Sequence, residues 1–188
     1  MIIRATTKLL SIARIKPVKM EASINGPLPG EWYASLLSTG RKGGSVIHFL
    51  HHPTLISILV LGRSLNKALD QLPVRLAGLL SRNGFAELMP GFELFTQPEI
   101  YTTNSRSILA NMTKMKMDLE YNLALLEVLD PHEINSLEDM YLTYLTGGKI
   151  ARSAGEDYIR FIVALFLNTP AVHPHSESVF RECEMKRS

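Results

Sequence analysis

The sequence predicts an α+β fold in which an antiparallel sheet, a meander of three or more strands, is covered by helices from the C-terminal half. The length of 188 residues suits one domain with a sizeable core. Segments rich in Val, Ile, Leu and aromatic residues, joined by short turns, dominate residues 31–61. From Ser64 onward, apolar residues recur with a helical period.

The N-terminal segment is predicted to form a first strand at Met1–Thr6 and a short helix at Thr7–Ile15, which Pro17 ends. Two prolines and two glycines make residues 25–30 a loop. Three further strands are expected at Glu31–Ser38, Ser45–Leu50 and Thr54–Leu61. Because only short turns join them, neighbouring strands should be antiparallel.

The strand at 54–61 is apolar on both faces, so we expect it inside the sheet with a covering layer on each side. A helix follows from Ser64. Pro73 either kinks this helix or starts a second one, because proline removes a backbone donor. Short strands are expected at Phe92–Phe95 and Glu99–Thr103.

Helices dominate the second half of the chain. Ser105–Val128 has apolar residues at spacings of four, three, four, four and three, which is typical of an amphipathic helix. Asp130 and Pro131 are a cap and a first helical residue for the next helix. Glu156–Asn168 is apolar almost all round, which predicts a buried central helix or a homodimer interface.

No repeat or linker divides the chain, so residues 1–170 are expected to form one domain, followed by a mobile tail at 171–188. The longest apolar run, at 161–167, is far shorter than the roughly 20 residues of a membrane-spanning helix. The single cysteine, Cys183, excludes an intrachain disulfide. These features favour a cytoplasmic protein that does not enter the membrane.

The charges are distributed unevenly. Residues 1–86 carry eleven Lys/Arg and three Asp/Glu, a net charge of +8, whereas residues 87–188 carry nine and fifteen, a net charge of −6. One interpretation is that acidic helices pack beside basic strands and partly cancel their fields. The other is a basic face that binds nucleic acid or an acidic protein.

Three segments resemble one bacterial family of unknown function. They are MIIRATTKLL at the start, TLISILVLG at 54–62 and NSRSILANM at 104–112, where the family usually has Asn-Arg-Ser-Val-Leu-Gly-Ser-Met. The chain departs from this pattern at Ala110 and at Thr113-Lys114. The resemblance implies no activity. It implies a bacterial cytoplasmic protein, often carried on plasmids or other mobile elements.

The histidines do not form a predicted metal site. His48 and His51 point to opposite faces of a strand, and His51 and His52 are expected in a surface turn. The glycine-rich residues 40–44 lack the strand-loop-helix context of a phosphate-binding loop. The sequence therefore predicts neither a metal nor a cofactor.

The best candidate site is the predicted helix start at Asn104, Ser105, Arg106 and Ser107. Free backbone donors, hydroxyls and a guanidinium can together hold a phosphate or carboxylate. Simple helix capping by Asn104 or Ser105 is the competing interpretation.

Three functions remain open at this point, the third being an interaction module that forms a homodimer through the apolar helix at 156–168. The first is a non-enzymatic binding or regulatory protein with a basic N-terminal half. The alternative is an enzyme that acts on a phosphorylated or anionic small molecule at the helix start. Residues assigned to anion or nucleic-acid binding are Arg4, Lys8, Arg41, Lys42, Asn104, Ser105, Arg106 and Ser107.

Overall fold

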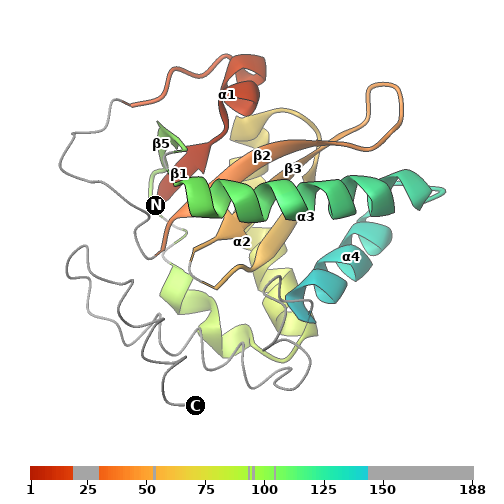
Figure 1. The fold of residues 1–188 in the computed structure, drawn as a ribbon. Coiled ribbons are helices and arrows are strands. Elements are labelled where there is room, and N and C mark those ends of the chain that lie inside the picture. Colours follow the sequence, from red (N-terminus) through yellow and green to blue (C-terminus); the bar gives the residue numbers. More distant parts are fainter. Residues whose placement is uncertain (19–29, 53, 93, 95, 104, 144–188) are drawn as a thin grey trace, which may run out of the picture.

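The computed structural model describes residues 1–18, 30–52, 54–92, 94, 96–103 and 105–143. Its sheet has five strands in the order β4-β3-β2-β1-β5 (Figure 1). The strands are β1 (Ile2–Ala5), β2 (Trp32–Ser38), β3 (Ser45–His51), β4 (Ser57–Leu61) and β5 (Glu99–Thr102).

The sheet is mixed, which corrects the prediction of an antiparallel sheet. The meander holds for β2, β3 and β4, whose neighbours pair antiparallel. However, β1 lies between β2 and β5 and pairs with both in parallel. Parallel neighbours need long connections that return the chain to the same end of the sheet. Helical segments supply them here, before β2 and before β5.

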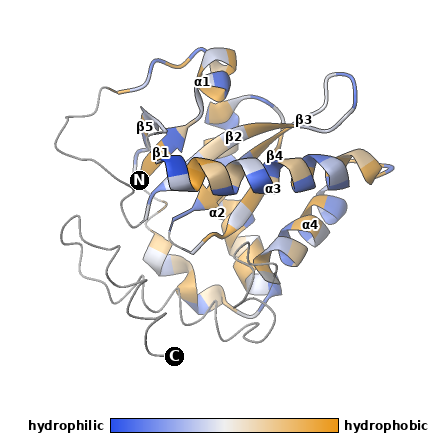
Figure 2. Cartoon of the chain, in the orientation of Figure 1, coloured by the Kyte–Doolittle hydropathy of each residue, from blue (hydrophilic) through white to orange (hydrophobic). Residues whose placement is uncertain are grey.

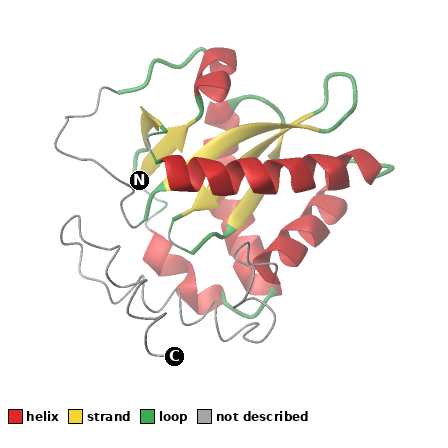
Figure 3. Cartoon of the chain, in the orientation of Figure 1, coloured by secondary structure: helices red, strands yellow, loops and turns green. Residues whose placement is uncertain are grey.

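Helices cover both faces of the sheet (Figures 1 and 3). One face carries α1 (Thr7–Ala13), α2 (Leu65–Arg82) and the 3₁₀ segment η1 (Ala86–Phe92). The other face carries α3 (Arg106–Leu125) and α4 (Pro131–Thr143). The prediction that helices of the C-terminal half cover the sheet is thus right for one face only. The other is covered by helices that lie before residue 94 in the chain.

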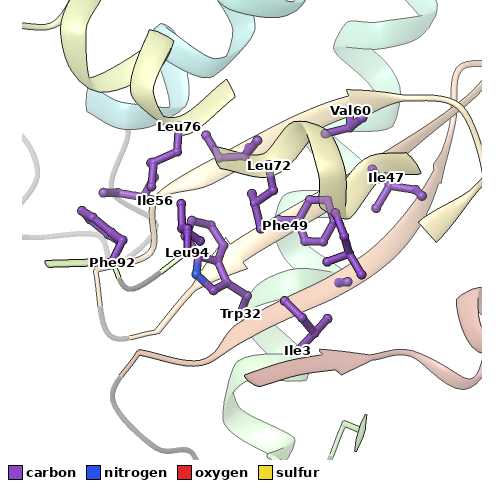
Figure 4. Packing of buried hydrophobic residues seen from close by; sticks show 14 of the residues in the cluster. Ile3, Trp32, Ile47, Phe49, Ile56, Val60, Leu72, Leu76, Phe92 and Leu94 are labelled. Carbon is purple, nitrogen blue, oxygen red and sulfur yellow. The ribbon is translucent and has the colours of Figure 1, made fainter. Parts of the chain in front are cut away.

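The first core lies between the sheet and α2. Trp32 of β2 and Phe49 of β3 point toward Leu72 of α2, and all three are fully buried (Figure 4). A single helix runs through Pro73, so no second helix begins there. Close packing of large side chains of this kind is worth roughly 3–5 kcal/mol per truncated aromatic residue.

The second core lies between the sheet and the helices α3 and α4. The predicted stripe of α3 is confirmed, because its apolar residues turn inward onto β2, β3 and β4. The buried members of the stripe are Ile108, Met112, Met115, Leu119 and Leu123. Asp130 caps α4 as predicted, since its Oδ1 accepts the backbone N–H of Glu133 at 2.9 Å.

Two local predictions were wrong. The strand at 54–61 does have covered faces, but β4 lies at the edge of the sheet and not inside it. Phe92 ends a 3₁₀ segment instead of starting a strand, because Ala86–Phe92 contains Pro90 and Gly91. The predicted helix at 156–168, the domain boundary at residue 170 and the tail 171–188 lie outside the described residues.

No helix in the described ranges is long and apolar enough to cross a membrane.

Candidate functional site at the carboxyl edge of the sheet

Four of the five strands end at the same edge of the sheet. β1 is parallel to β2 and β5, and β4 shares their direction because two antiparallel pairings separate it from β2. Their carboxyl ends therefore point in the same direction, which we call the carboxyl edge, and β2 continues four residues past Ala34, the partner of the last residue of β1. The segments that follow these carboxyl ends are the start of α1, the loop 39–44, the connection 62–64 and the start of α3.

Local turn chemistry fixes these connections. Gly40 and Gly43 have φ values of +73° and +77°, which residues with a Cβ rarely adopt. The backbone N–H of Gly62 donates to Ser45 O at 2.8 Å, which ties the residue after β4 to the first residue of β3. Thr6 caps α1, because its Oγ1 accepts the N–H of Leu9 at 3.4 Å.

Exposed cations gather on these connections. Each is exposed, and none forms an ion pair with another residue in the described ranges. They come from four separate segments that the sheet direction brings to one edge. We call them the edge cations: Lys8, Arg41, Lys42, Arg63, Lys67 and Arg106.

The edge cations are widely spread. Gly40 packs against the end of α3, where a Cβ on residue 40 would come within 3.2 Å of the Ala124 Cβ. Arg106 begins the same helix. The rise of about 1.5 Å per residue separates Arg106 from Ala124 by about 27 Å. A single small anion therefore does not contact both Arg106 and the loop 39–44.

The start of α3 lies beside the end of β1. Helices α1 and α3 leave the neighbouring strands β1 and β5 toward opposite faces, which is the kind of position where α/β sheets bind ligands. Ser105 nevertheless acts as a cap, with its Oγ accepting the N–H of Ile108 at 3.4 Å. The Ser107 Oγ lies 3.1 Å from the Ser105 Oγ. Asn104 is outside the described residues.

Arg4 lies inside the protein. Its guanidinium contacts Glu31 through two bonds, Nε to Oε2 at 2.7 Å and Nη2 to Oε1 at 2.5 Å, with both side chains buried. Tyr33 donates its hydroxyl to Glu31 Oε2 at 3.1 Å, and burial raises the pKa of Tyr33. Arg4 is thus a buried structural cation and does not belong to the edge cations.

A second charge cluster joins α2, α4 and β4. The carboxylate of Glu138 is fully buried, accepts the N–H of Leu59 at 2.8 Å and contacts the guanidinium of Arg75 at 2.8 Å. Arg82 lies 3.3 Å from Glu138 and 3.1 Å from Asp139. Burial raises the pKa of Glu138. Here acidic residues of the second half do neutralise basic residues of the first.

His48 and His51 of β3 are buried, which corrects the expected place of His51 in a surface turn, while His52 lies in a turn as expected and is half-buried. His48 and His51 do point to opposite faces, as predicted, and bond the hydroxyls of Ser57 at 3.1 Å and Thr54 at 2.8 Å. Burial lowers the pKa of His48 to about 4 and that of His51 to about 3. In the described ranges, no three His, Cys, Asp or Glu residues are grouped to hold a metal.

Sequence reasoning missed the partners of the buried charges. Glu31 and Glu138 carry no local signal, since Glu31 lies 27 residues from Arg4 and Glu138 lies 79 residues from Leu59. The edge cations Arg63 and Lys67 were missed for a related reason. Only the strand directions place them beside the other segments.

Comparison with known proteins gives one result. No curated protein and no solved structure shows a significant match to the chain. A family model matches residues 2–147, which include every described element of the fold. The chain therefore belongs to the family described as Domain of unknown function (DUF6933).

Proposed function

We propose that the protein is a non-enzymatic binding protein that holds a polyanion, nucleic acid in the first place, along the carboxyl edge of its sheet. One observation carries the proposal. Six exposed cations from four separate segments share this edge, and no described acidic residue pairs with them. Unpaired surface cations on one side of a molecule are typical of a nucleic-acid footprint.

The spread of the edge cations favours a polymer. Arg106 begins α3 and lies about 27 Å along the helix from Ala124, beside which the loop 39–44 packs. A nucleic acid presents phosphates over such a distance, with about one charge per 1.7 Å of duplex axis. A small phosphorylated molecule is much shorter, so it meets only one or two of the edge cations at a time.

The enzyme alternative has weaker support. At the start of α3 the Ser105 hydroxyl serves as a cap, so it accepts a backbone donor that an anion would otherwise use. The histidines that most often supply acid–base catalysis are buried on opposite faces of β3. Arg106 contributes to the proposed binding surface as one cation among six.

The cellular setting is part of the same proposal. The resemblance of the sequence to a bacterial family often found on mobile elements supports an accessory or regulatory protein of such an element. A cytoplasmic location is consistent with the single cysteine. An acidic protein is the competing partner, and the experiment separates it from nucleic acid.

Fluorescence anisotropy tests the proposal with labelled duplex DNA, single-stranded DNA, single-stranded RNA and polyglutamate. We expect binding to at least one nucleic acid, with an affinity that falls steeply between about 50 and about 200 mM salt. Tight binding of polyglutamate alone would instead identify an acidic protein as the partner. Undetectable binding of all four probes at low salt would refute the proposal.

Variants locate the binding surface. Arg41→Gln with Lys42→Gln should weaken binding and lower the slope of log affinity against log salt by about 0.9 for each lost phosphate contact. Arg63→Gln with Lys67→Gln should do the same. Lys16→Gln is the matched control, since Lys16 is exposed and follows the C-terminal end of α1, whereas the edge cation Lys8 lies at its start. Equal losses in control and edge variants would contradict the assigned surface.

A further inference from the structure

The loop 39–44 is attached to the last turns of α3. The backbone N–H of Ser38, which precedes the loop, donates to Glu120 Oε1 at 2.7 Å. Gly40 packs against Ala124 so closely that a Cβ on residue 40 would come within 3.2 Å of the Ala124 Cβ. These two contacts lie about one turn apart on α3, so they hold the base of the loop against the helix.

The loop is also closed on itself. The N–H of Gly44 donates to Arg41 O at 3.1 Å, and the N–H of Arg41 donates to the Thr39 hydroxyl at 3.4 Å. Thr39 is fully buried, and a Cβ on residue 44 would collide with its hydroxyl, so the loop requires glycine there. Arg41 and Lys42 are therefore carried by a backbone with a defined shape, while their side chains are exposed.

Helix α3 sets the distance between this loop and Arg106. It is one uninterrupted helix that crosses the sheet, and its buried apolar face packs on β2, β3 and β4 (Figure 1). Arg106 is its first residue, and Ala124 lies about 27 Å farther along the helix axis. Figure 2 shows hydrophilic residues at both places, at the start of α3 and in the loop 39–44. The cations at the two ends of this span keep a fixed spacing.

A fixed spacing of this length suits a nucleic-acid duplex. A duplex has a persistence length of about 50 nm, so it behaves as a rigid rod over about 27 Å. This length corresponds to about eight base pairs, at about 3.4 Å for each phosphate along a strand. A single strand is flexible, and it would lose conformational freedom when its phosphates are held at positions that the protein sets.

The residues around the edge cations have the chemistry of phosphate contacts. In the described segments 6–8, 39–44, 62–67 and 105–107 they are threonines, serines and glycines, with one leucine and one asparagine. Hydroxyls, amides and backbone N–H groups are the usual partners of phosphate oxygens beside Arg and Lys. None of the residues in these segments is aromatic, whereas proteins that bind single strands stack the bases on aromatic side chains. This composition favours contacts with the backbone of a duplex.

We propose that the polyanion is a nucleic-acid duplex, bound through its phosphates over about eight base pairs between Arg106 and the loop 39–44. The inference rests on the proposed binding of nucleic acid at the carboxyl edge. Phosphates carry no sequence information, so the duplex is bound without regard to its sequence. Glu120 is a positioning residue, because it holds the loop and its negative charge repels phosphate.

Fluorescence anisotropy of the full chain tests the proposal with labelled DNA and RNA duplexes of about 12 base pairs and with single strands that have the same number of phosphates. We expect the duplexes to bind at least about tenfold more tightly, because their charge density is higher and they need no ordering. Two duplexes of unrelated sequence should bind equally. Single strands that bind as tightly as duplexes would overturn the inference and leave the proposed function standing. Undetectable binding of every nucleic acid would overturn both.

The length of the duplex tests the span. Hairpins with stems of about 5 and about 12 base pairs, closed by the same nucleotides, have stem lengths of about 17 and about 41 Å. Only the longer stem reaches from Arg106 to the loop 39–44. Arg106→Gln should therefore weaken binding of the longer stem several-fold and binding of the shorter stem much less. An equal loss for both stems would contradict the assigned span.

Two variants of Glu120 separate positioning from charge. Glu120→Gln keeps an acceptor for the Ser38 N–H and removes a negative charge, so the affinity for the duplex should stay the same or rise. Glu120→Ala removes the acceptor as well, and we expect it to weaken binding several-fold although it removes the same charge. If both variants raised the affinity equally, binding would not need the attachment of the loop to α3, and the fixed span would be wrong.

Tyr121→Ala tests for stacking of bases. Tyr121 is 65% exposed on α3 and follows Glu120 in the chain. Its removal should leave the affinity for the duplex unchanged, since phosphate contacts need no aromatic ring. A several-fold loss would show that bases stack on Tyr121, as they do in proteins that bind single strands, and would overturn the proposal.

Discussion

The cations of the described fold occupy two different settings. Arg4, Arg75 and Arg82 contact buried carboxylates, which are those of Glu31 and Glu138. The edge cations instead face solvent at the carboxyl edge without an acidic partner among the described residues. The same excess of positive charge in the sequence therefore performs two tasks. One part holds distant segments together, and the other is available for a partner.

This difference shows why the position of a charge matters more than the count. A buried ion pair broken on one side leaves an uncompensated charge, which costs roughly 3–5 kcal/mol. An exposed cation costs little to remove, because water solvates it in both folded and unfolded states. Substitutions in the buried ion pairs should therefore lower the stability of the fold. Substitutions of the edge cations should weaken binding and change stability little.

The largest effect on stability is expected at the Arg4–Glu31 pair. Arg4→Ala leaves the buried Glu31 carboxylate with the Tyr33 hydroxyl as its remaining side-chain donor. We expect a loss of about 3–5 kcal/mol in the free energy of unfolding, measured by urea titration. Arg4→Met combined with Glu31→Leu should recover much of the loss. If Arg4→Ala lowered the free energy of unfolding by less than about 1 kcal/mol, the Arg4–Glu31 pair would contribute no more than an exposed ion pair does, which would contradict the prediction.

A somewhat smaller effect is expected at Glu138, whose partners Arg75 and Arg82 have side chains 18% and 31% exposed. Glu138→Ala removes the acceptor of the Leu59 N–H at the sheet edge. It also removes the buried carboxylate that the guanidiniums of Arg75 and Arg82 contact. We expect a loss of about 3 kcal/mol by urea titration.

Asp139→Asn is the control for Glu138→Ala, because the Asp139 side chain is 36% exposed. It should cost less than about 1 kcal/mol. Equal losses for Asp139→Asn and Glu138→Ala would show that burial of the carboxylate does not set the cost.

Much of the fold was predictable because helices and strands are encoded locally. The buried apolar face of α3 follows from spacing alone, and Asp130 with Pro131 marks the start of α4. Strand directions are not local. Nothing within β1 indicates that it lies between β2 and β5. The place of a strand in the sheet depends on its connections, and connections as long as these are compatible with more than one strand order.

The candidate site was predictable only in part for the same reason. Lys8, Arg41 and Arg106 are exposed cations, but Arg4, which lies four residues before Lys8, is buried. In the sequence nothing distinguishes Arg4 from them, since its partner Glu31 lies 27 residues away. His51 looked like a turn residue because His52 and Pro53 follow it, while the strand pairing carries β3 through His51.

Acid should destabilise the interior and leave the carboxyl edge unaffected. Burial lowers the pKa of His48 and His52 to about 4 and that of His51 to about 3, from 6.5. The unfolded chain therefore takes up protons first as the pH falls below 6.5. The free energy of unfolding should fall from about pH 6.5 to about pH 4, by up to roughly 1.4 kcal/mol per pH unit for each histidine.

His48→Asn isolates one of these contributions. Asn has no titrating group in this range, so the slope of stability against pH should fall by about a third relative to the wild-type chain, whatever the change in stability at neutral pH. Urea titrations at several pH values between 4 and 7 measure the slope. An unchanged slope would mean that His48 takes up its proton in the folded protein as readily as in the unfolded one.

The smallest change in stability is expected at the edge cations. Arg41→Gln with Lys42→Gln should alter the free energy of unfolding by no more than about 0.5 kcal/mol, because both side chains are solvated and unpaired among the described residues. Arg75→Gln is the comparison, since it removes one positive charge from a contact with buried Glu138 and should cost several times more. If the loop 39–44 variant lost as much stability as Arg75→Gln, its cations would be structural, and the carboxyl edge would not be a free binding surface.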